Sequence, residues 1–115
     1  MAFDEDLAAR IRELVRNEAG LTEKRMFGGL AFLISGNMAI SASGQGGVLV
    51  RVDPARTAEL ASRLHAEVAV MRGQEMQGWL RVDPEGVRTQ ALLQRWVHEG
   101  VAYARSLPGK PSGSR

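Results

Sequence analysis

A run of alternating apolar residues, interrupted by glycines, most constrains how this chain can fold. Between residues 23 and 52, apolar side chains recur at every second position, as at Leu30, Phe32 and Ile34 and again over 48–52. A period of two places such side chains on one face of a β-strand. Glycine-rich steps separate the apolar stretches at short intervals. Turns this closely spaced join antiparallel neighbours, because parallel strands need long crossover connections.

The glycines at these steps are predicted to be structural turn residues. Gly28 and Gly29 follow one candidate strand, and Gly36 follows the next. Glycine adopts a positive φ without steric cost, as tight turns between strands require. The alternative is a glycine loop that binds an anion, but such a loop normally leads into the N-terminus of a helix. Because β-type alternation follows Gly29 and no Gly-Lys-Ser or Gly-Lys-Thr step is present, the sequence favours turns.

Helical periodicity precedes this region of strands. Leu7, Ile11, Leu14 and Val15 are spaced as one apolar stripe, and Asp4 stands where a capping side chain is expected. An N-terminal helix is therefore predicted.

Two further helices are predicted after the strands. The tetrapeptide RVDP occurs at 51–54 and at 81–84, and in both places aspartate can cap a helix that begins with proline. The first of these helices covers 55–64. The second covers 85–107 and carries Trp96 on its apolar stripe.

One or two strands are predicted between these helices, the firmer at 79–82 and a shorter candidate at 68–71. The order of elements indicates an α+β fold: an antiparallel sheet of about five strands with an N-terminal, a middle and a long C-terminal helix packed on it. A chain of 115 residues fits one domain. We place that domain at 1–107, with 108–115 as a flexible C-terminal tail.

Composition argues against several kinds of chemistry. The chain has no cysteine, which removes disulfides, thiolate catalysis and cysteine metal ligands. It has two histidines, whereas a zinc site needs at least three converging ligands. We therefore expect no metal, no cofactor and no catalytic residues. The acidic N-terminus and the lack of a long apolar run predict a cytoplasmic protein that does not enter a membrane.

Four residues form the candidate interaction surface: Lys24, Arg25, Phe27 and Trp79. The first three lie at the rim of the predicted hairpin, and Trp79 alternates out of phase with the apolar residue at position 80. Trp79 could pack beneath a helix, cover the second face of the sheet, or anchor an interface. These three alternatives stay open at the level of the sequence.

The sequence resembles the TfoX N-terminal domain family, the Sxy-type competence regulators of bacteria. The resemblance extends over about residues 5–110 and is carried by RMFGGLAFLISGNM (25–38), LVRVD (49–53), MQGWLRV (76–82) and LLQRWVHEGVAYARSLPGK (92–110). It implies an α+β domain that is not known as an enzyme. The founding members promote expression of DNA-uptake genes alongside a cyclic-AMP-responsive transcription factor. Those longer proteins carry a second, C-terminal domain that this sequence does not include.

These observations lead to the hypothesis of a non-enzymatic regulatory domain that acts by contact with a protein partner. The partner is unidentified, a homodimer is one option, and contact with DNA is expected to be indirect or weak. One alternative is weak nucleic-acid binding through arginines dispersed along the chain. Another is a small-ligand binder or enzyme built around the Gly28–Gly29 hairpin and Glu75, an acid for which the sequence suggests no capping role.

Overall fold

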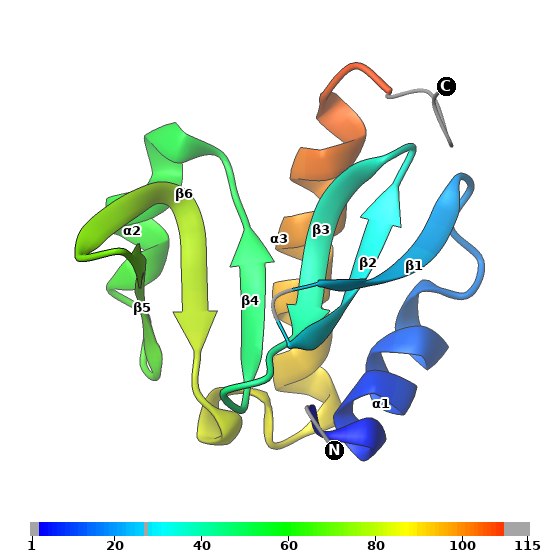
Figure 1. Cartoon of the computed structure of the whole chain (residues 1–115), viewed down its shortest axis with the longest axis horizontal. Coiled ribbons are helices and arrows are strands. Elements are labelled where there is room, and N and C mark those ends of the chain that lie inside the picture. Colours follow the sequence, from blue (N-terminus) through cyan, green and yellow to red (C-terminus); the bar gives the residue numbers. More distant parts are fainter. Residues whose placement is uncertain (1–2, 27, 110–115) are drawn as a thin grey trace.

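A computed structural model describes residues 3–26 and 28–109 (Figure 1). Within those ranges the chain forms one six-stranded antiparallel sheet, in the order β1-β2-β3-β4-β6-β5, and three α-helices. The predicted α+β fold is confirmed, with six strands in place of about five. The strands are β1 (Leu21–Met26), β2 (Gly29–Ile34), β3 (Asn37–Ala42), β4 (Val48–Arg51), β5 (Ala66–Met71) and β6 (Gln74–Val82). The helices are α1 (Glu5–Val15), α2 (Thr57–Ala61) and α3 (Gln90–Ser106), with 3-10 helices η1 (Pro54–Arg56) and η2 (Pro84–Val87).

The glycines after β1 and β2 lie where the chain reverses. Gly28 has a φ of 76° and Gly36 a φ of 86°, the conformation that a turn at these positions requires. Gly29 is the first residue of β2 and pairs with Met26. A Cβ atom on Gly29 would collide with the carbonyl oxygen of Ala42 on β3, so glycine is needed there for close packing. A strand follows these glycines, and the loop therefore lacks the helix that an anion cradle uses.

Strand β3 contains an extra residue where α3 lies close to the sheet. Phe32 pairs with Ile40 while its neighbour Leu33 pairs with Met38, which leaves Ala39 unpaired as a β-bulge. The bulge places Met38 and Ile40 on opposite faces of the sheet. Accordingly, Ile40 belongs to the main core and Met38 to the cluster on the other face.

All three helices cover the same face of the sheet. Figure 1 shows α3 behind the sheet, along β3 and β4. The main core combines side chains of the three helices with inward-facing strand residues: Leu7, Ile11 and Val15, Leu60, Leu93, Trp96 and Val97, with Phe32, Ile40, Val48, Val50, Leu80 and Val82. Trp96 is only 4% exposed, which confirms its predicted place in the core.

The opposite face of the sheet has a separate apolar cluster to which no helix of the described chain contributes. We call it the open face. It comprises Ala31, Met38, Leu49 and Ala69, with the partly buried Met26, Leu33, Met71 and Trp79.

Two of the predicted helix starts differ from the structure. Asp53 and Asp83 do cap, through Oδ1 to the amides of Ala55 and Gly86, but the segments that they cap are the short η1 and η2. Gly86 is buried within η2, where a Cβ atom would collide with the Val82 side chain. Helix α3 begins only at Gln90, after its own cap Thr89.

The segment that follows α3 contacts the start of β3. Asn37 Nδ2 donates a hydrogen bond of 2.9 Å to the carbonyl oxygen of Pro108. Residues 110–115 of the predicted tail lie outside the described residues. Among the helices that are described, none has the length and apolar character to cross a membrane.

A bidentate ion pair attaches α1 to the edge strand β1. Arg12 Nε lies 2.6 Å from Glu23 Oε2, and Nη2 lies 3.0 Å from Oε1. These hydrogen bonds lower the pKa of the Glu23 carboxyl below its ordinary value. The pair is partly exposed, so its contribution to stability is modest.

We expect Glu23→Gln to lower the free energy of unfolding by on the order of 0.5 kcal/mol at pH 7. Because the folded-state pKa is lowered, this contribution is present above the ordinary carboxyl pKa and disappears as pH falls through the folded-state pKa. Urea unfolding of both proteins from pH 7 into the acid range measures the difference. Glu13→Gln, which removes a much more exposed pair with Arg16, is the control. A difference that grew on acidification would contradict the assignment.

Candidate binding face of the sheet

The predicted interaction residues on β1 point to opposite sides of the sheet. Glu23 and Arg25 face the helices, since Glu23 binds α1 and the Arg25 guanidinium lies 5.4 Å from the ring centre of Phe3. Lys24 alternates with them, so it lies on the open face with Met26 and is exposed. Phe27 lies outside the described residues.

Trp79 lies on the open face, half-buried in the cluster of strand side chains. Of the three alternatives for this residue, packing beneath a helix is therefore wrong. The guanidinium of Arg51, its cross-strand partner, lies 5.2 Å from the Trp79 ring centre and 5.7 Å from that of Tyr103. This cation–π stack fixes Trp79 at the end of the apolar cluster.

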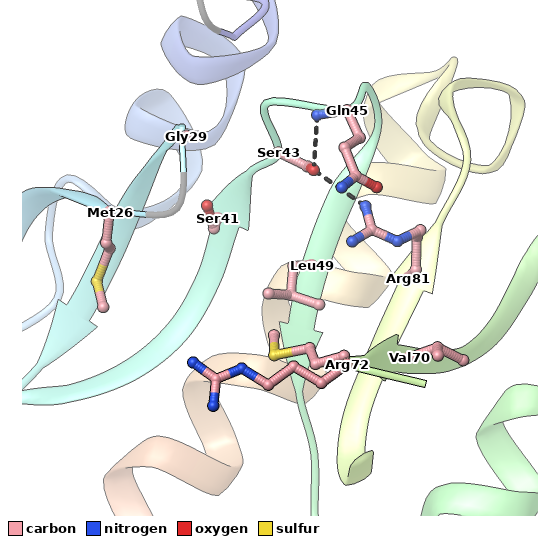
Figure 2. A pocket seen from close by; sticks show the side chains of 10 residues that line it. Met26, Gly29, Ser41, Ser43, Gln45, Leu49, Val70, Arg72 and Arg81 are labelled. Atoms are coloured by element: carbon pink, nitrogen blue, oxygen red, sulfur yellow. Dashed lines mark hydrogen bonds between the residues drawn. The ribbon is translucent and has the colours of Figure 1, made fainter. Parts of the chain in front are cut away.

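A cavity of about 340 Å³ is set into the open face (Figure 2). Residues from the two edge strands, Met26 on β1 and Met71 on β5, both line it, so the sheet curves around the cavity. Its lining also includes Gly29, Ser41, Ser43, Gln45, Leu49, Val70, Arg72 and Arg81. Figure 2 shows Arg72 and Arg81 on either side of Leu49, which lies between them. The cavity thus combines an apolar floor with cationic walls.

A small hydrogen-bond network orders the end of the cavity near Arg81. The Ser43 hydroxyl oxygen accepts a hydrogen bond of 3.1 Å from the backbone N–H of Gln45 and one of 3.0 Å from Arg81 Nη1. Ser43 is 9% exposed, so this hydroxyl is largely removed from bulk water. The network fixes the position of the Arg81 guanidinium relative to the turn after β3.

Three cationic side chains of the open face form no ion pair with any carboxylate that the structure describes. Within the described chain, neither Arg72 nor Arg81 has a carboxylate within 4.0 Å, and the same holds for Lys24. Glu67 lies opposite Arg81 across the β5–β6 pairing but forms no ion pair with it. The open face is therefore a locally cationic surface.

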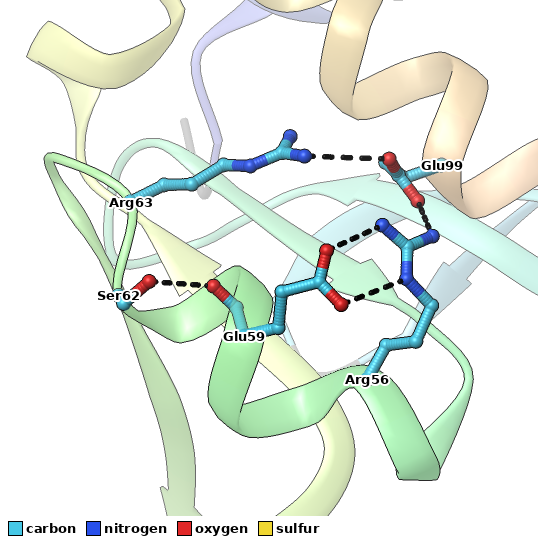
Figure 3. A network of polar contacts seen from close by, with 5 residues as sticks. All are labelled: Arg56, Glu59, Ser62, Arg63 and Glu99. Atoms are coloured by element: carbon cyan, nitrogen blue, oxygen red, sulfur yellow. Dashed lines mark hydrogen bonds and ion pairs between the residues drawn. The ribbon is translucent and has the colours of Figure 1, made fainter.

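On the helix side, arginines are engaged in ion pairs that hold elements together. Arg56 binds Glu59 at 3.2 Å and Glu99 of α3 at 2.8 Å, and Arg63 approaches Glu99 at 3.8 Å (Figure 3). The hydrogen bond from Arg56 lowers the pKa of the Glu59 carboxyl. The Arg63 guanidinium also lies 5.5 Å from the ring centre of Trp96. These arginines link the α2 region to α3 and have a structural explanation.

The structure does not bring Glu75 together with the Gly28–Gly29 hairpin, the two parts of the alternative site. Gly29 lines the cavity, but Glu75 does not. Glu75 is an exposed residue of β6, paired with Val70, and lies outside the strand predicted at 79–82. The strand continues there because β5 and β6 form a hairpin whose turn is Arg72–Gly73, with φ of 53° and 78°.

The histidines lie apart from this cavity. His65 is in the turn before β5, with Nδ1 3.1 Å from Asp83 Oδ2, and His98 is exposed on α3. Within the described residues, no three His, Asp or Glu side chains gather as metal ligands. The chemistry available in the cavity is that of hydrogen-bond donors and cations beside an apolar surface.

Sequence reasoning missed Ser43, Arg72 and Arg81 as cavity residues. A signal existed for Arg81, which alternates with Leu80 and Val82 and must therefore face away from the core. No comparable signal marks Arg72, because its approach to the cavity depends on the curvature of the whole sheet.

The chain was compared with models of known protein families. The model of the TfoX N-terminal domain family matches residues 13–104 of the 115-residue chain, from within α1 to near the end of α3. No curated protein and no solved structure matches the chain.

Proposed function

This chain belongs to the TfoX N-terminal domain family, and we propose that it is a non-enzymatic regulatory domain that acts by binding another protein. One feature of the fold supports this role. The apolar cluster of the open face lies on a side of the sheet where the described helices do not pack, and it reaches the surface through its partly buried members Met26, Leu33, Met71 and Trp79. Apolar patches bordered by polar residues are typical of protein interaction sites.

The residue types on this face are those that favour protein contacts. Trp, Met and Arg are enriched in interface cores, and buried tryptophan and arginine side chains often dominate the binding energy. Trp79 and Met71 supply the apolar contact, while Arg81 and Lys24 supply polar contacts near it. We propose that this contact serves the regulation of gene expression, the role that the resemblance to competence regulators implies.

Binding to nucleic acid is less well supported than binding to protein. Phosphate recognition needs several cations free on one surface. Several arginines of this chain are already in ion pairs. Arg12, Arg56, Arg63 and Arg105 pair with acids of other elements, and Arg16 and Arg88 pair with acids three residues before them in the sequence. Contact with DNA is therefore proposed to be indirect, through the partner.

Two adjacent charge reversals test which face binds the partner. Lys24→Glu alters the open face, and Arg25→Glu makes the same change on the helix side of the same strand. We expect quantitative affinity purification from cells to recover a protein partner with wild type and Arg25→Glu. Recovery with Lys24→Glu should fall several-fold, because a charge reversal at an interface replaces attraction by repulsion.

The folded state of both variants is checked by circular dichroism before the comparison. Arg25→Glu removes a cation–π contact worth only ~0.5–1 kcal/mol, so the fold should be retained. Equal recovery with both variants would contradict binding through the open face.

A further inference from the structure

The Ser43 hydroxyl provides the starting observation. A serine hydroxyl has one proton to donate and two lone pairs that accept. Both lone pairs of Ser43 accept hydrogen bonds, one from the backbone N–H of Gln45 and one from Arg81 Nη1. No hydrogen bond donated by the Ser43 hydroxyl is found within the described chain, although Ser43 is largely buried. A hydrogen-bond donor is thus held ready at the wall of the cavity.

Arg81 adds further donors at the same place. A guanidinium has five N–H groups, and one hydrogen bond of Arg81, to Ser43, is found within the described chain. Arg72 contributes a second positive charge on the other side of Leu49 (Figure 2). No carboxylate is among the described residues that line the cavity. Converging donors and positive charge are chemically complementary to an oxyanion.

The remaining wall is apolar and determines the rest of the ligand. Leu49, Met26 and Met71 line the cavity between and beside the two arginines. A volume of about 340 Å³ lies at the lower end of the range for small-molecule sites. An inorganic anion would leave this apolar surface unfilled, whereas an organic anion would cover it.

We propose that the cavity of the open face binds a small organic anion. Its carboxylate, sulfonate or phosphate group is held by Arg81 and the Ser43 hydroxyl, with Arg72 adding long-range attraction. Its apolar body packs against Leu49 and the two methionines. This inference goes beyond the proposed regulatory role, because a ligand would bind there without any protein partner.

A pair of fluorescent probes that differ by one sulfonate tests the proposal. 8-Anilino-1-naphthalenesulfonate carries the anion, and N-phenyl-1-naphthylamine is its neutral analogue. For wild type we expect the sulfonate probe to bind more tightly, with affinity that falls as salt is added. Arg81→Gln should weaken the sulfonate probe by ~10-fold or more, since a hydrogen bond to a charged group is lost. The neutral probe should be unaffected.

Three further variants test whether a loss of sulfonate binding is specific to the cavity. Ser43→Ala removes one donor from the turn, and Arg72→Asn removes a charge while keeping a residue that tolerates positive φ. Both should weaken the sulfonate probe alone. Arg88→Gln, an exposed arginine outside this cavity, is the matched control and should change nothing. Urea unfolding of each variant confirms that the folded state is being titrated.

Two results would overturn the proposal. The first is equal affinity of wild type for the sulfonate and the neutral probe. The second is a loss of sulfonate affinity that is the same for Arg88→Gln as for Ser43→Ala and Arg81→Gln. Either result would mean that the probes report apolar surface or net charge and not this donor cluster. Because purified chain alone is used, failure here leaves the partner-binding proposal to its own test.

Discussion

Replacing Trp96 by alanine is expected to lower the free energy of unfolding by ~3–5 kcal/mol. Trp96 is 4% exposed, belongs to the main core and is stacked by Arg63. Its truncation removes a large apolar surface and leaves a cavity between α3 and the sheet. Domains of this kind have ~5–15 kcal/mol of stability in total, so the variant should be close to unfolding. Urea denaturation followed by far-UV circular dichroism measures the change.

The second tryptophan provides the matched control. Trp79 is half-buried on the open face, so Trp79→Ala should cost ~1–2 kcal/mol, much less than the same change at Trp96. The two variants lose the same atoms and differ in the burial of the side chain and in the face of the sheet on which it lies. If Trp79→Ala were as costly as Trp96→Ala, the open face would be part of the folding core and not a surface held for binding.

Gly100→Ala is expected to destabilise the chain by ~2 kcal/mol, even though alanine favours helix more than glycine does. Gly100 lies in α3 directly over the β-bulge, and a Cβ there would collide with the carbonyl oxygen of Ala39. The obstacle is backbone, so no side-chain rotation can relieve it. The loss from this collision should exceed the ~1 kcal/mol gain in helix propensity.

Ala102→Gly is the control in the same helix. Ala102 is exposed, so the change should cost only the ~1 kcal/mol of propensity. Both substitutions are then destabilising although they exchange alanine and glycine in opposite directions. A neutral or stabilising Gly100→Ala would show that α3 does not approach β3 as closely as the structure has it.

The fold was predictable where each element carries its own signal. The period-two spacing of Leu30, Phe32 and Ile34 predicted β2 with the correct face inward, because burial of one face imposes that period. Gly36 predicted its turn for an equally local reason. The start of α3 was wrong, since the Asp-Pro step at 83–84 is equally compatible with a 3-10 turn and the choice depends on the packing of buried Gly86.

The candidate site depends on relations that no local pattern contains. Strand β4 pairs with β6, placing β5 at the edge, and that order is set by long-range packing. Only the resulting curvature brings Met26 and Met71 to one cavity. The prediction that Lys24 and Arg25 belong to one interaction surface was an avoidable error. Strand alternation already separates neighbouring side chains, so their opposite orientations could have been inferred from the sequence.

The central claim is that this domain acts through the open face of its sheet. The most direct measurement is the transcript profile of the organism that encodes the chain, with the native gene replaced by Lys24→Glu, by Arg25→Glu or by a deletion. Our account predicts that Lys24→Glu reproduces the profile of the deletion, while Arg25→Glu retains the profile of wild type. A wild-type profile for folded Lys24→Glu, or a deletion profile for Arg25→Glu alone, would contradict it.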